Sequence, residues 1–127
     1  MRRFHGKILD ENIEGTSPIF SSPEHNKVLG LAEDLSLFFL TDTVNAASIT
    51  ITAQIEQSAD QMQWQNKAPT PEVDAVAISP SLVTTIVVRD DGTVPSCSFL
   101  RLRVSLGGTG APKAHVRLWA TARRGAL

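Results

Sequence analysis

The side chains best suited to bind a partner lie in two stretches near the C-terminus, 98–106 and 114–124. Arginine and aromatic residues occupy alternate positions of both stretches, and the six singled out are Phe99, Arg101, Arg103, Arg117, Trp119 and Arg123. Arginine can form ion pairs and stack on aromatic rings, and arginine and tryptophan are enriched in interface hot spots. This composition predicts a surface that binds a protein neighbour.

Apolar and polar residues alternate in both stretches, which predicts two β-strands with one face in a core. If residues 107–113 form the connecting loop, the two strands make a hairpin. In this hairpin Arg101 lies opposite Trp119, where the two can stack as a cation–π pair. The same register places Arg103 opposite Arg117.

Charge is unevenly distributed along the chain, although the formal net charge is only −1. All 13 acidic residues lie at or before Asp91, and six cations follow in the hairpin region. Like charges across a sheet are destabilising, so we expect an anion near Arg103 and Arg117: Glu56, Asp60, a neighbour's carboxylate or a phosphate. Neutralisation within the chain and a basic binding patch both stay open. So few cations on a nearly neutral chain favour a protein partner over nucleic acid.

Residues that could perform catalysis or hold a metal do not form a recognisable set. The single cysteine, Cys97, excludes an internal disulfide and a cysteine-rich metal site, and His5, His25 and His115 are far apart in the sequence. The glycines within 107–110 suggest a phosphate-binding loop, but such a loop needs a following helix N-terminus, and the next segment alternates as a strand. We therefore expect no enzyme activity, no cofactor and no metal site.

Short segments rich in Ile, Val and Thr, separated by turn residues, predict an all-β domain. The clearest strand is Ser48–Ser58, followed by a polar turn that Asp60 can hold and that returns to Trp64. The segment Leu35–Leu40 is apolar on both faces, which indicates a strand that is central in a sandwich or covered by another chain. About six to eight strands at these intervals are typical of an antiparallel β-sandwich or jelly roll.

The chain divides into a polar N-terminal segment, residues 1–27, and a β-sandwich domain, residues 28–127. The first segment holds one expected short strand near Arg3–Leu9 and several proline-containing turns. It either packs on its own domain or reaches a neighbouring subunit as an arm. It lacks the apolar region of a secretory signal, and no apolar stretch has the length to cross a membrane. We expect synthesis in the cytoplasm without secretion by a signal peptide.

Two stretches resemble known families. QSADQMQW (57–64), after a strand rich in Ile and Thr, resembles the Ser-x-Asp turn and tryptophan of galactose-binding-like (discoidin-type) β-sandwiches. FLRLRVSLGG (99–108) is similar to their penultimate hairpin, and small jelly-roll proteins of phages and phage-like particles share such strand patterns. The chain departs from the discoidin pattern at Gln61, where a glycine is expected, and it has no acidic Ca²⁺ loop. The resemblance implies the fold and transfers no binding residue.

Two hypotheses about function remain. The first is a non-enzymatic structural subunit at the surface of a phage or phage-like particle, such as a head decoration or minor capsid-type protein. Its partners would be the protein subunits of a symmetric assembly, copies of itself included. The second is a carbohydrate-binding module of galactose-binding-like fold, in which Trp64 or the 107–113 loop contacts sugar.

Overall fold

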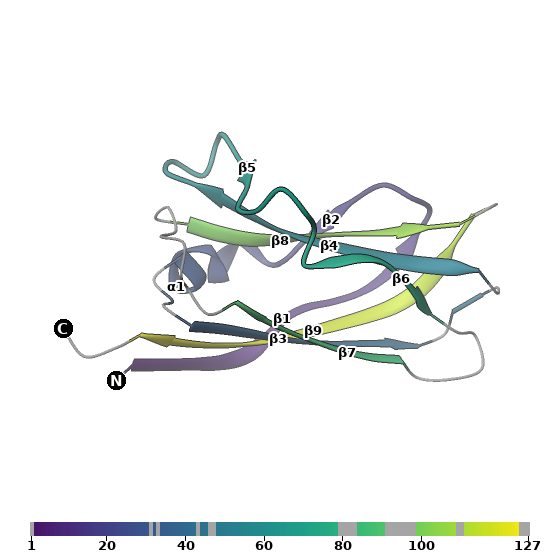
Figure 1. Cartoon of the computed structure of the whole chain (residues 1–127), viewed down its shortest axis with the longest axis horizontal. Coiled ribbons are helices and arrows are strands. Elements are labelled where there is room, and N and C mark those ends of the chain that lie inside the picture. Colours follow the sequence, from purple (N-terminus) through teal and green to yellow (C-terminus); the bar gives the residue numbers. More distant parts are fainter. Residues whose placement is uncertain are drawn as a thin grey trace.

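Nine strands make up most of the described part of the chain, which in this computed structural model comprises residues 2–30, 32, 34–42, 44–45, 48–78, 84–90, 99–108 and 111–124. For residues 2, 3, 84–90 and 124 the backbone alone is described. The strands form two sheets that stack face to face (Figure 1). The fold is an antiparallel β-sandwich, as the sequence predicted.

The two sheets, named sheet A and sheet B, each mix strands from distant parts of the chain. Sheet A has the order β1-β9-β3-β7, and its strands are β1 (Arg2–Glu14), β3 (Asp34–Asp42), β7 (Thr84–Asp90) and β9 (Lys113–Arg124). Sheet B has the order β2-β8-β4-β5, with β6 also paired to β4; its strands are β2 (Ile19–Phe20), β4 (Ile49–Ser58), β5 (Gln65–Asn66), β6 (Val73–Ile78) and β8 (Phe99–Gly107).

The core lies between the sheets and takes every second residue of the long strands, because alternate side chains of a strand point to opposite faces. On β8 and β9 the predicted alternation is confirmed: Leu102, Val104, Val116, Leu118 and Ala120 are all 0% exposed. The residues between them face outward and are at least partly exposed.

Strand β3 lies between β9 and β7 in sheet A, and its two faces differ. Leu35, Leu37 and Phe39 are buried in the core. Phe38 and Leu40 face outward, and Phe38 is 40% exposed. The core therefore accounts for one apolar face of this strand and leaves the other at the surface.

The predicted hairpin between β8 and β9 is wrong. β8 pairs with β2 and β4, whereas β9 pairs with β1 and β3, so the connecting segment crosses from sheet B to sheet A. Asn45 fixes this crossing: its Nδ2 donates to the Ala111 carbonyl at 3.0 Å and its Oδ1 accepts the Lys113 amide at 2.9 Å. The Gly15 amide also donates to the Pro112 carbonyl at 2.8 Å. These bonds start β9 beside β1 rather than beside β8.

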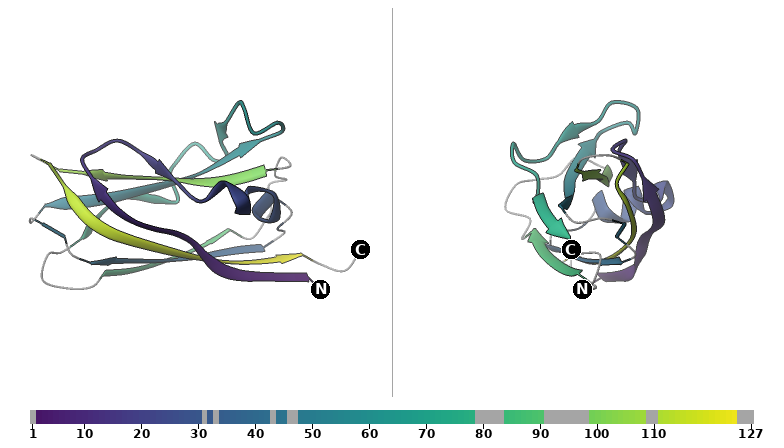
Figure 2. Two further views of the ribbon diagram at one scale, coloured as in Figure 1. Left: turned by 180° about the vertical axis from the view of Figure 1, so that it is seen from behind. Right: turned by 90° about the vertical axis from the view of Figure 1, so that its right-hand side faces the viewer.

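The N-terminal residues form a long edge strand. β1 pairs with β9 of the same chain, and Arg2 lies opposite Arg124, so the start of β1 and the end of β9 run side by side (Figure 2). A bulge near Lys7 shifts the register and lets both Ile8 and Leu9 face the core, an effect expected of an extra residue in one strand.

Two short helices follow β2. The 3₁₀ turn η1 (Pro23–His25) leads into α1 (Asn26–Gly30), whose Leu29 is 0% exposed. None of the described helices is long and apolar enough to cross a membrane.

Candidate interaction surfaces

The six predicted interface residues lie on the two opposite outer faces of the sandwich. Sheet B carries Phe99, Arg101 and Arg103 on β8, and sheet A carries Arg117, Trp119 and Arg123 on β9. The structure does not bring the two sets together, because β8 and β9 belong to different sheets. The expected pairs of Arg101 with Trp119 and of Arg103 with Arg117 are both wrong, and each residue has other neighbours.

On sheet B, Arg101 is held by two aromatic rings and a carboxylate. Its guanidinium carbon lies 4.0 Å from the centre of the Phe20 ring and 4.2 Å from that of Trp64. Its Nε donates to Glu56 Oε1 at 2.8 Å, across the β8–β4 pair. The stacking predicted for Arg101 therefore occurs on Trp64, and Glu56 neutralises Arg101 instead of Arg103.

The turn after β4, residues 58–64, forms a hook held by side-chain oxygens, as the sequence predicted. Ser58 Oγ accepts the Asp60 amide at 3.2 Å, and Asp60 Oδ1 accepts the amides of Met62 and Gln63 at 2.9 and 3.0 Å. These amides, Gln63 before Met62, lower the pKa of Asp60 because they stabilise its charged form. The hook carries Trp64 back over sheet B to the Arg101 side chain.

Two exposed apolar side chains lie on the elements that hold Arg101, which are β2 and the hook. Phe20 is 41% exposed and Met62, in the hook, is 84% exposed. Arg103 is also exposed and makes no hydrogen bond or ion pair with any residue that the structure describes. We name Phe20, Met62, Trp64, Arg101 and Arg103 the sheet B patch. Arginine, methionine and aromatic residues are the types enriched in protein interfaces.

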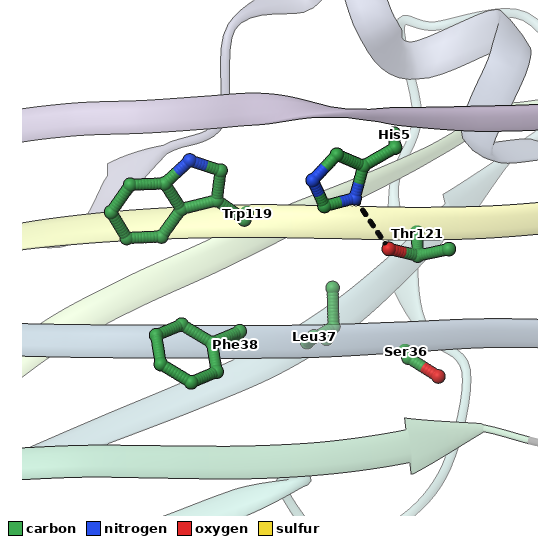
Figure 3. Close-up of a pocket in the computed structure, with 6 residues that line it drawn as sticks. All are labelled: His5, Ser36, Leu37, Phe38, Trp119 and Thr121. Carbon is green, nitrogen blue, oxygen red and sulfur yellow. Dashed lines mark hydrogen bonds between the residues drawn. The ribbon is translucent and has the colours of Figure 1, made fainter.

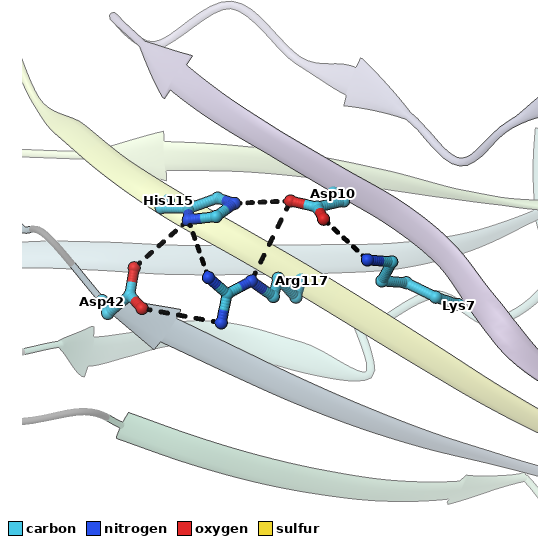
Figure 4. A network of polar contacts seen from close by, with 5 residues as sticks. All are labelled: Lys7, Asp10, Asp42, His115 and Arg117. Atoms are coloured by element: carbon cyan, nitrogen blue, oxygen red, sulfur yellow. Dashed lines mark hydrogen bonds and ion pairs between the residues drawn. The ribbon is translucent and has the colours of Figure 1, made fainter.

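On sheet A, a polar network joins three neighbouring strands (Figure 4). Lys7 Nζ bonds Asp10 Oδ2 at 2.8 Å, and His115 Nε2 bonds Asp10 Oδ1 at 2.5 Å. Asp42 lies 3.4 Å from His115 Nδ1 and 3.8 Å from Arg117 Nη1. The hydrogen bonds from Lys7 and His115 lower the pKa of Asp10 to about 2. Of the two alternatives left open by the sequence, neutralisation within the chain applies to Arg117, through Asp10 and Asp42 rather than Glu56 or Asp60.

Beside this network, sheet A carries a hollow of about 470 Å³ over β1, β9 and β3 (Figure 3). Its lining residues are His5, Ser36, Leu37, Phe38, Trp119 and Thr121. The rings of Phe38 and Trp119 meet edge to face, with centroids 5.9 Å apart and planes at 66°. His5 Nδ1 and Thr121 Oγ1 are hydrogen-bonded at 2.7 Å.

Several of these residues were missed by sequence reasoning. Phe38 had a signal, because it is the outward residue of a segment that is apolar on both faces. Phe20, His5, Asp10 and Asp42 had none, because their roles depend on which strands pair.

The described residues show no group of three or more His, Cys, Asp or Glu side chains that could hold a metal ion. His115 and Asp10 resemble part of a catalytic pair, but each ring nitrogen of His115 faces a carboxylate. Neither nitrogen is therefore directed at a nucleophile.

No family model and no curated protein matches the sequence. Among solved structures, the fold is similar to a chain of infectious bursal disease virus, Gt strain (TM-score 0.65, 10% identity), over 95% of this chain and 32% of the viral one. It is also similar to the PBSX exported protein XepA (TM-score 0.56, 16% identity), over 98% of this chain and 38% of XepA. A third likeness is to the CBM22-1 xylan-binding domain of Paenibacillus barcinonensis Xyn10C (TM-score 0.53, 10% identity), over 74% of this chain and 58% of that domain.

These likenesses concern the fold. The chain spans about a third of the length of the viral chain. One of these similar structures belongs to a virus and another is a xylan-binding domain, so the fold by itself does not assign a function.

Proposed function

We propose that this chain is a non-enzymatic structural subunit of a virus-like or phage-like particle and that it binds neighbouring protein subunits through the sheet B patch. The observation that carries the proposal is the position of Arg101, whose guanidinium stacks on both Phe20 and Trp64. Its Nε is used by Glu56, and its terminal nitrogens make no hydrogen bond to a described residue. An arginine held in this way loses little side-chain entropy when it binds.

The partner that fits this arrangement presents a carboxylate within an apolar surface. The terminal nitrogens of Arg101 can hold a carboxylate in bidentate geometry. Arg103 adds a second cation two residues away, and Phe20 and Met62 supply exposed apolar area beside it. A chain of infectious bursal disease virus has a similar fold, so the fold is compatible with this role.

The first experiment is sedimentation of the native source material, with this chain followed by mass spectrometry across the gradient. We expect recovery with a large particle at a fixed ratio to a major shell protein. Recovery only near the top of the gradient, as a free small protein, would overturn the assembly role.

Two variants then test the patch. Met62→Asp and Arg103→Glu change exposed side chains that make no contact essential to the fold, so both should fold normally and be recovered outside the particle. Phe38→Asp is the control on the opposite face, where Phe38 is 40% exposed. Trp119 also lies on that face, so Trp119→Ala should leave assembly intact. Normal incorporation of both patch variants would contradict the proposed interface.

A further inference from the structure

The hollow on sheet A has an aromatic end with a fixed geometry. Phe38 and Trp119 lie directly opposite each other on β3 and β9, and their edge-to-face contact restrains both rings. Phe38 remains 40% exposed, so part of this aromatic surface faces solvent. An apolar face of a small molecule can pack against it and remove that area from water.

The other end of the hollow is polar and lies on the same three strands. In the register of sheet A, His5 is opposite Thr121, and Thr121 is opposite Ser36. The bond between His5 Nδ1 and Thr121 Oγ1 orients the imidazole, which lies between Trp119 and Thr121 (Figure 3). The Ser36 hydroxyl makes no hydrogen bond to a described residue. Two hydroxyls and an imidazole thus present donors and acceptors in the same hollow as the aromatic pair.

The lining side chains that the structure describes include no carboxylate, lysine or arginine. On the side of the neighbouring network, Lys7 and Arg117 both pair with Asp10. On the other side, Asp34 and Arg123 lie opposite each other, two residues beyond Ser36 and Thr121. The ligand class that matches an aromatic wall, convergent hydroxyls and a described lining without a carboxylate, lysine or arginine is a neutral polyol ring. We propose that this hollow binds one pyranose ring of a neutral glycan, stacked on Trp119 and hydrogen-bonded to His5, Thr121 and Ser36. The role is additional to assembly, because it uses the face opposite the sheet B patch.

The experiment uses the full chain on an array of immobilised neutral and sialylated glycans. A titration in solution follows with methyl β-D-glucopyranoside, methyl β-D-galactopyranoside and N-acetylneuraminic acid. The chain has two tryptophans, so in a Trp64→Phe variant the fluorescence comes from Trp119 alone. We expect neutral glycans to be retained on the array and a neutral methyl glycoside to shift that fluorescence.

Variants on each face make the test specific. Trp119→Ala should weaken binding about tenfold or more, because the stacking surface is lost. Ser36→Trp changes an outward residue and should abolish binding by filling the hollow, which keeps the test valid if Trp119→Ala folds poorly. Trp64→Ala should bind as the parent does.

Three results would overturn the proposal: no neutral glycan retained, retention of sialylated glycans alone, or binding that survives Ser36→Trp. Binding lost in Trp64→Ala and kept in Trp119→Ala would also overturn it and move the site to the hook. Because particle assembly is read by sedimentation and depends on the other face, failure of one proposal leaves the other testable.

Discussion

Arg101 is the residue on which the outer face of sheet B depends. It stacks on Phe20 of β2 and on Trp64 of the hook, and its Nε bonds Glu56 of β4. Glu56 is only 8% exposed, so its charge needs this partner. One side chain therefore connects the short strand β2, the hook and the centre of sheet B.

We predict that Arg101→Ala lowers the free energy of unfolding by about 2–4 kcal/mol, because it leaves the nearly buried Glu56 carboxylate without its partner. Arg103→Ala is the matched control on the same face of β8 and should change stability by less than about 0.5 kcal/mol. Urea unfolding monitored by circular dichroism measures both. Equal effects of the two substitutions would contradict the role given to Arg101.

Asp10 gives the network on sheet A a dependence on pH. Its pKa is lowered from 3.8 to about 2, chiefly by the hydrogen bond from Lys7 and next by that from His115. A carboxyl with a lower pKa in the folded state stabilises the fold above its unfolded pKa and loses that contribution as pH falls through the folded value.

We therefore predict that stability falls between pH 3.8 and about 2 partly through Asp10. Asp10→Asn should reduce the slope of unfolding free energy against pH in this window. Asp74→Asn, which removes an exposed carboxylate from β6, controls for the loss of one negative charge. An unchanged slope in Asp10→Asn would show that the network does not hold Asp10 ionised.

At the scale of elements, the hook is a turn built on two side chains. Ser58 is 2% exposed, and its Oγ accepts amides of Asp60 and Gln61 and donates to Asp60 Oδ1. Gln61 has a φ of 62°, a left-handed conformation in which glycine is favoured. This is the position at which the discoidin-type pattern has glycine, and here Gln61 adopts the left-handed conformation that glycine favours.

We predict that Ser58→Ala destabilises the chain by about 1–2 kcal/mol, because two amides of the hook lose their acceptor. The matched control is Ser105→Ala, at an outward position of β8, which should have little effect. Thermal unfolding gives the stability of both variants, and the exposure of Trp64 can be followed by fluorescence quenching. A Ser58→Ala variant as stable as Ser105→Ala would mean that the hook does not need this hydroxyl.

The strands β8 and β9 show which features of the fold can be predicted from the sequence and which cannot. Their alternation places Leu102 and Leu118 in the core, and that is confirmed because it depends only on the two-residue period of a strand. The pairing partner does not follow from this period, since any neighbour with an apolar inner face satisfies it. Asn45, far away in the sequence, fixes β9 in sheet A through its bonds to the crossing segment. Because Asn45 holds β9 in sheet A, the six predicted interface residues are divided between the two sheets.

The residue types of the candidate site were predictable and its geometry was not. Arginine stacked on tryptophan was expected, and it occurs between Arg101 and Trp64. Trp119 instead meets Phe38, because β3 lies beside β9. Partners across a sheet are set by strand order, which a single sequence with similar strands leaves undetermined.

At the scale of the whole molecule, the sandwich separates two outer faces with different chemistry. Sheet B exposes Phe20 and Met62 around a fixed arginine, whereas sheet A presents paired charges beside an aromatic hollow. A subunit in an assembly can bury one face against a neighbour and keep the other in solvent. The two proposals therefore describe one molecule, bound through sheet B and open at sheet A.

Oxidative footprinting of the assembled and free chain tests this arrangement directly. Met62 is 84% exposed in the free chain, so peroxide should convert it rapidly to the sulfoxide. We predict that assembly slows this oxidation about tenfold or more, because Met62 becomes buried against the neighbour. Hydroxyl-radical labelling of Phe38 on sheet A should stay unchanged and serves as the internal control. Protection of Phe38 with continued oxidation of Met62 would reverse the assignment: sheet A would then be the interface, and the hollow would be closed to sugar in the particle.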